Sequence, residues 1–158
     1  MTADAAAQRR MEMTDRIRAE TGIDEGMIAE LVDRFYARVR EDALIGPVFA
    51  AKIADWGPHL QRMRTFWSSV ALMTGNYHGQ PMRLHMPLPI DAEHFDRWLA
   101  LFEATAREVC PPVAAEHFLE RARRIAESLE LGIAVGSGVI LESGGRYRRA
   151  AEGRAAGA

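Results

Sequence analysis

The stretch HGQPMRLHMPLPI, residues 78–90, interrupts a chain whose central segments otherwise have helical periodicity. It contains two histidines and three prolines within thirteen residues. Proline lacks a backbone N–H and disfavours helical geometry at the residue before it, so a helix here can run only from Pro81 to about Met86, ahead of Pro87. His85 is therefore expected near the end of a very short helix held between loops.

Longer helices are predicted on both sides of this stretch, because apolar residues recur there at spacings of three and four. Aspartates stand where helix N-caps are expected, and glycine or proline follows where the helices should stop. No segment has the alternating, β-branched pattern of a strand, so the predicted fold class is all-α. The predicted helices are 25–41 after Asp24, 56–73 before Gly75 and Asn76, a third from Asp91 to just before Pro111, and about 112–134.

The two ends of the chain have weaker patterns. Residues 1–21 mix alanine with balanced charges and carry only a thin apolar stripe, which predicts a frayed helix or a disordered arm. Residues 136–158 contain six glycines and four arginines against two glutamates, which predicts a flexible, mildly basic tail. A single domain is expected between them, over residues 22–135.

Composition excludes several classes of protein. A formal charge of −2 and a pI near 6.2 give no electrostatic support for binding nucleic acid. No apolar run approaches the roughly 20 residues that span a bilayer, and the N-terminus lacks the apolar core of a secretory signal. Cys110 is the single cysteine, so the chain has no intramolecular disulfide and no multi-cysteine metal site. We expect a cytoplasmic monomer or weak dimer.

Few motifs of chemistry are present. The sequence has no Glu-x-x-His, no His-Glu-x-x-His, no phosphate-binding glycine loop and no Gly-x-Ser-x-Gly. Any one histidine could be a core residue bonded to a backbone carbonyl. Together, however, His85, His59, Tyr36 and Trp98 bring polar groups from four elements into an aromatic interior, which favours haem. A proximal histidine would bind the iron through Nε2 while its Nδ1–H donates to a carbonyl or carboxylate.

Three segments carry a resemblance to a known family. They are DRFYARVREDALIGPVF at 33–49, WGPHLQRMRTFWSSVALMTGNYHGQPMRLHMPLPI at 56–90 and HFDRWLALF at 94–102. In order and spacing they resemble the group III truncated haemoglobins, which are bacterial globins, over about residues 24–132. The resemblance implies a two-helix-on-two-helix sandwich with a shortened first helix, a short loop-held proximal helix and one haem b.

The resemblance also implies roles for the residues at matching motif positions. His85 becomes the proximal ligand of the haem iron, and Pro58 leaves two orientations open for His59, toward the interior or toward solvent. Arg62 either pairs a haem propionate or is a solvated surface residue. The implied distal ligand pocket comprises Tyr36, His59, Met63 and Trp98, and the implied haem pocket comprises Phe35, Phe49, Arg62, Phe66, Tyr77 and His85.

Three classes of function remain open from the sequence. The first is a globin that reversibly binds O₂, NO or another diatomic ligand. The second is a haem redox enzyme, for NO dioxygenation or peroxide turnover, which would need an external reductase because the chain has no flavin or nicotinamide motif. The third is a helical interaction module without haem.

Overall fold

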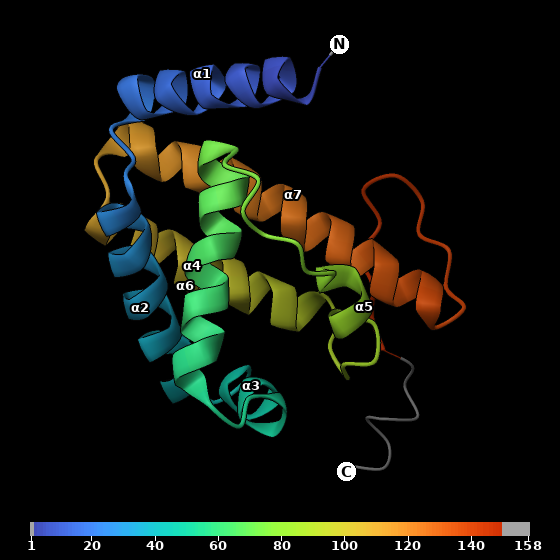
Figure 1. Cartoon of the computed structure of the whole chain (residues 1–158). Helices are drawn as coiled ribbons and strands as arrows, with labels where there is room; N and C mark the ends of the chain where they lie inside the picture. The colour runs from blue at the N-terminus through green and yellow to red at the C-terminus, as the bar shows by residue number, and fades with distance from the viewer. Residues whose placement is uncertain (1, 150–158) are drawn as a thin grey trace.

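The protein is helical throughout the part that the structure describes. The computed structural model describes residues 2–149 and contains seven helices and no strand within that range (Figure 1). No helix in those residues is both long enough and apolar enough to cross a membrane. The helices are α1 (Ala3–Thr21), α2 (Glu25–Glu41), α3 (Gly46–Lys52), α4 (Trp56–Leu72), α5 (Pro81–His85), α6 (Ala92–Val109) and α7 (Pro112–Gly136).

Side-chain caps set two of the predicted helix starts. The Asp24 side chain accepts a hydrogen bond from the Met27 N–H at 2.8 Å at the start of α2. At the start of α6, the Asp91 side chain caps the helix, and the Asp91 N–H donates to His94 Nδ1. The two residues thus form a capping box. The predicted end of α4 at residue 73 is one residue too late. The helix ends at Leu72, and Met73 already adopts a left-handed φ of 58°.

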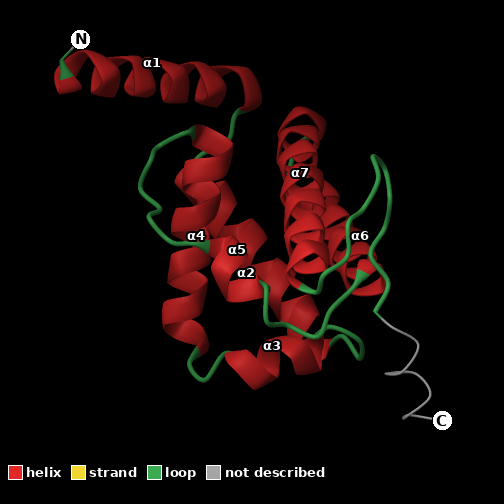
Figure 2. Cartoon of the chain, turned by 90° about the vertical axis from the view of Figure 1, so that its right-hand side faces the viewer, coloured by secondary structure: helices red, strands yellow, loops and turns green. Residues whose placement is uncertain are grey.

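The four long helices α2, α4, α6 and α7 form two layers. Figure 2 shows α2 and α4 on one side of the molecule and α6 and α7 on the other. Each helix contributes one fully buried aromatic ring to the shared core: Phe35, Trp67, Phe102 and Phe118. Trp67 stacks on Phe102 with ring centroids 4.9 Å apart, and Phe35 meets Phe102 edge-on at 5.3 Å. The predicted all-α, two-on-two sandwich is confirmed.

The N-terminal residues differ from the expected frayed or disordered arm. Helix α1 runs unbroken from Ala3 to Thr21 and ends at Gly22, whose φ of 74° is left-handed and favours glycine. It packs through a buried stripe of Thr14 and Ile17, and the Thr14 hydroxyl donates to the Leu72 carbonyl at 2.6 Å. This contact, across 58 residues of sequence, stabilises a helix whose own composition is weak.

The C-terminal segment, here residues 137–149, also differs from the flexible tail that the sequence predicts. Tyr147 is buried, and Arg146 bonds to Glu130 of α7 and Asp96 of α6. Glycine and arginine content suggested disorder, but these partners are distant in sequence and invisible to local composition. Residues 150–158 of the predicted tail lie outside the described residues.

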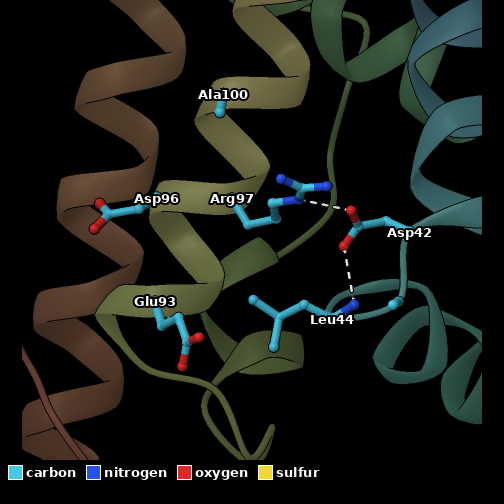
Figure 3. A pocket seen from close by; sticks show the side chains of 7 residues that line it. Asp42, Leu44, Glu93, Asp96, Arg97 and Ala100 are labelled. Atoms are coloured by element: carbon cyan, nitrogen blue, oxygen red, sulfur yellow. Dashed lines mark hydrogen bonds and ion pairs between the residues drawn. The ribbon is translucent and has the colours of Figure 1, made fainter.

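A buried carboxylate joins three helices at the end of α2. Asp42 Oδ2 accepts hydrogen bonds from the N–H groups of Leu44 and Ile45 at 3.1 and 3.0 Å, which shapes the turn into α3. Its Oδ1 accepts from Arg97 Nε of α6 at 2.6 Å, as Figure 3 shows. The sequence did not predict α3, and this turn explains how so short a helix is held.

Replacing Asp42 by asparagine is expected to lower the free energy of unfolding at pH 7 by about 1–3 kcal/mol, since buried donors lose a charged acceptor. The Ile45 N–H, aided by Arg97, holds the pKa of Asp42 below its ordinary value despite burial. Because the pKa of Asp42 is lower in the folded state than in the unfolded state, its ionised form stabilises the fold at any pH above the unfolded pKa of about 3.9. This stabilisation is lost as the pH falls through the lower pKa of the folded state.

Urea unfolding of the native chain and of Asp42→Asn at pH 7 and pH 3 measures this effect. The difference between the two proteins should shrink at pH 3. Glu41→Gln, at the exposed neighbouring position, is the matched control and should differ little from the native chain at either pH. An equal loss at both pH values would refute the ionic contribution of Asp42.

Candidate functional site

His85 lies at the last position of α5 and is half-buried. Its Nδ1 is 2.6 Å from the Pro81 carbonyl oxygen, one turn earlier. Because a carbonyl only accepts, Nδ1 carries a proton, and in the neutral ring Nε2 then keeps its lone pair. This is the tautomer that a metal ligand requires, and the carbonyl holds the ring in place.

Close packing on α7 fixes α5, which is too short to be stable alone. Met82 and Met86, four residues apart, lie over Gly132 and Gly136, which are also four residues apart. A Cβ atom at Gly132 would clash with Met82 Sδ, and one at Gly136 would lie 2.8 Å from Met86 Cε. The two glycines therefore leave room for the Met82 and Met86 side chains against α7.

Tyr36 is the most enclosed polar residue of the predicted distal side. It is 5% exposed, and its ring meets the rings of Phe49, Trp56 and His59 at centroid distances of 5.8, 5.9 and 5.2 Å. Burial raises the pKa of the phenol far above its ordinary value, so the hydroxyl stays protonated at neutral pH. Tyr36 is thus a hydrogen-bond donor inside an aromatic cluster.

His59 points toward the interior, which resolves the two orientations left open by Pro58. Its ring stands edge-on to Tyr36 and to Trp56, and its Nε2 is buried without a hydrogen-bond partner among the described residues. Burial, together with the nearby charges of Arg62 and His85, lowers the pKa of His59 below its ordinary value. His59 is therefore a neutral imidazole whose Nε2 is buried and unpartnered among the described residues.

Trp98 comes from α6 and is half-buried. It stacks on Phe102 with centroids 5.5 Å apart and meets Phe35 edge-on, also at 5.5 Å. Phe35 also contacts Tyr36, and the centroids of these two rings are 5.0 Å apart. Phe35 therefore connects Tyr36 and Trp98, which come from opposite layers.

The remaining predicted residues divide between the core and the surface. Phe66 and Tyr77 form an edge-on pair at 5.1 Å, and the Tyr77 N–H is fixed by Ser69 Oγ at 2.8 Å. Met63 is half-buried against the main core. Arg62 is exposed, and its positive charge contributes to the lowered pKa of His59.

Two other histidines have structural partners, which separates them from the candidate site. His94 belongs to the cap of α6, and His117 Nε2 donates to the Ala71 carbonyl at 2.8 Å. His117 is thus a histidine bonded to a backbone carbonyl, which is the interpretation that the sequence left open for each histidine. His78 is exposed in the loop before α5.

Sequence reasoning missed the role of Trp56. Its ring contacts Tyr36, Phe49 and His59, and the Arg40 guanidinium lies 4.7 Å from its centroid. The signal was present, because Trp56 and His59 stand three residues apart at the start of α4 and so share one face.

The comparisons with known proteins agree with this arrangement. The family model described as bacterial-like globin matches residues 20–130. The group 3 truncated haemoglobin ctb of Campylobacter jejuni is 34% identical over 113 residues, 68% of this chain and 89% of that protein.

Solved structures give the same result for the fold. The crystal structure of the group III truncated haemoglobin from Campylobacter jejuni matches with a TM-score of 0.65 at 34% identity, over 68% of this chain and 89% of that one. A truncated oxygen-avid haemoglobin from Bacillus subtilis matches with a TM-score of 0.57 at 26% identity, over 68% and 94% of the two chains. This chain therefore belongs to the bacterial-like globin family, as a group III truncated haemoglobin.

Proposed function

We propose that this chain binds one haem b through His85 and reversibly binds O₂, NO or another diatomic ligand on the side of Tyr36, His59 and Trp98. The observation that carries the proposal is the pair His85 and His59. His85 has an Nε2 without a partner, and His59 has a buried Nε2 that also lacks one among the described residues. A buried polar atom without a partner is costly, so a ligand from outside the chain is expected to complete this site.

The donor set favours iron within a macrocycle over a bare metal ion. Within residues 2–149, no three His, Cys, Asp or Glu side chains are grouped so that they could hold a metal ion. A single neutral imidazole suits iron whose other ligands belong to a porphyrin. Truncated globins are a haem-binding family, which supports the same choice.

When bound, haem supplies an iron atom with one open position for a diatomic ligand. The protein's part is to hold the His85 ring through Pro81 and to present donors on the other side. Tyr36 keeps its O–H because burial raises its pKa, Trp98 has an indole N–H, and neutral His59 has one ring N–H. Such donors favour a polarised ligand over an apolar one.

The aromatic residues around the donors are expected to line the haem pocket and exclude water. Arg62, exposed near His59, is expected to pair a haem propionate. The lining residues in this proposal are Phe35, Phe49, Met63, Phe66 and Tyr77.

A redox role is the second candidate, because the same three donors would also stabilise charge during NO dioxygenation or peroxide turnover. Such turnover needs electrons from a separate reductase. Reversible O₂ binding is favoured first, and the oxygen-avid Bacillus subtilis neighbour supports it. Family membership argues against a helical interaction module, and we expect a cytoplasmic monomer or weak dimer.

Repeated oxygenation tests the proposed function. The ferrous protein is exposed to air and then deoxygenated, and its absorption spectrum is followed over several cycles. Return to the starting ferrous spectrum each time is the expected result. Conversion to the ferric form in every cycle would contradict reversible binding, and continued NO consumption with an added reductase would favour the enzyme.

A further inference from the structure

The C-terminal segment turns back from α7 and runs to the start of α6 (Figure 1). It lies beyond residue 130, where the match to the globin family ends. The Tyr147 carbonyl accepts a hydrogen bond from the Ala92 N–H at 2.8 Å, and the Arg149 N–H donates to Asp91 Oδ2 at 3.1 Å. The segment thus contacts the residues at which α6 begins.

An ion pair between the buried carboxylate of Glu130 and the partly exposed Arg146 anchors this segment to α7. The Glu130 side chain is 6% exposed, and both of its oxygens accept from Arg146 Nε, at 3.1 and 3.0 Å. The Tyr147 N–H donates to the same carboxylate at 2.8 Å, and Arg146 Nη2 reaches Asp96 at 2.6 Å. Removing one partner of such a pair leaves a buried charge uncompensated, so these contacts hold the segment firmly in place.

The anchored segment packs against the linker between α5 and α6, residues 86–91. Tyr147 is 7% exposed and belongs to a small apolar cluster with Ile90 of the linker and Ile133 of α7. Arg149 Nη1 also donates to the Pro89 carbonyl at 3.3 Å.

The linker has few hydrogen bonds of its own with which to hold a fixed path. Pro87 and Pro89 have no N–H to donate. The Leu88 N–H donates to the His85 carbonyl at 3.0 Å, and the Ile90 N–H donates to the Leu88 carbonyl at 2.9 Å. Through Leu88, these two bonds connect Ile90 to His85, so displacement of Ile90 is expected to shift His85 as well.

We infer that Tyr147 and Arg146 are positioning residues that fix the linker and thereby the orientation of His85. The inference rests on the proposed function, in which His85 binds the haem iron. The C-terminal segment would act through Ile90 and the start of α6, the helix that also carries Trp98.

Tyr147→Ala and Tyr147→Phe form the matched pair of variants for the test. Alanine removes the ring that belongs to the same apolar cluster as Ile90, whereas phenylalanine removes only a hydroxyl for which no hydrogen bond is found among the described residues. Arg146→Lys is the second variant, because a lysine keeps the charge but cannot bridge Glu130 and Asp96 as the guanidinium does. It keeps the test valid if Tyr147→Ala does not fold.

Two measurements use the haem-loaded protein. The rate of haem loss to a haem-scavenging apoglobin should rise by roughly tenfold in Tyr147→Ala, which corresponds to about 1.4 kcal/mol. The iron–histidine stretching band of the ferrous protein should shift or broaden in resonance Raman spectra. Arg146→Lys should change in the same direction, and Tyr147→Phe should match the native chain.

A third measurement uses the haem-free chain and therefore does not depend on the proposed function. Hydrogen exchange of peptides covering residues 84–92 should accelerate in Tyr147→Ala, while peptides from α2 remain protected. If the native chain binds no haem, the proposed function fails, and the exchange pattern still decides whether the segment fixes the linker. An unshifted iron–histidine band, or an equal loss of protection throughout the chain, would overturn the positioning role.

Discussion

Replacing His85 by alanine is expected to abolish haem retention or weaken it severely. The imidazole is the proposed protein ligand of the iron, and its Nδ1–H bond to the Pro81 carbonyl leaves Nε2 available for that bond. Without it, only apolar contacts and the proposed Arg62–propionate pair would hold the macrocycle. The measurement is the ratio of Soret to protein absorbance after purification with excess haemin, for the native chain and for His85→Ala.

His78→Ala is the matched control for this prediction. His78 lies seven residues earlier in the same proline-containing stretch, but it is exposed in the loop before α5. Its removal should leave the Soret band intact. Full haem occupancy of His85→Ala with an unchanged ferrous spectrum would show that another residue binds the iron.

Removing the distal donors is expected to have the second largest effect, on the dissociation of O₂. A hydrogen bond to a polarised acceptor contributes about 1.5–3 kcal/mol, so Tyr36→Phe or Trp98→Phe should each speed O₂ loss by roughly tenfold to a hundredfold. Phenylalanine keeps most of the apolar volume of either residue while deleting the O–H or N–H. Stopped-flow measurement of O₂ and CO dissociation from the ferrous proteins tests this.

CO provides the internal control, because bound CO is much less polarised than bound O₂. Its dissociation rate should therefore change far less in the two variants. The double variant should show coupling, since both donors would share one acceptor. Phe35 links the two rings, which is a second reason to expect non-additivity. Equal changes for CO and O₂ in both single variants would mean that the pocket acts by shape and not by hydrogen bonding.

Local periodicity and capping predicted most of the helical framework. The bounds of α2 match the prediction because one apolar stripe and one capping residue, Asp24, both lie within the segment. The loop-held α5 could also be predicted, since Pro81 and Pro87 limit any helix there to a few residues. These features depend on residues close together in sequence.

The ends of the chain could not be predicted in this way. Helix α1 depends on a hydrogen bond from Thr14 to Leu72, and the C-terminal segment depends on Arg146 reaching Glu130 and Asp96. Each pairing spans a separation over which composition carries no information. Low apolar content therefore predicted a frayed helix or disordered arm at one end and a flexible tail at the other, whereas tertiary contacts hold residues 3–21 and 137–149 in place.

The candidate site, like the fold, could be predicted from the sequence only in part. His85 was singled out by its proline-bounded position together with the resemblance to truncated haemoglobins, and the same resemblance implied the roles of Tyr36, His59 and Trp98, which stay predictions. The inward orientation of His59 and the ring contacts of Trp56 required the folded arrangement of α2 and α4. Spacing along one helix shows which residues share a face, but not what that face meets.

A haemin titration of the purified haem-free chain, followed by spectra of the ferric, ferrous and ferrous–CO forms, tests the central claim most directly. The claim is that His85 binds haem iron on one side and leaves the other side open. We predict saturation at one haemin per chain, a Soret band distinct from that of free haemin, and a clear further shift when CO is added to the ferrous form. A spectrum that never departs from that of free haemin, or a ferrous form that CO does not alter, would contradict the claim.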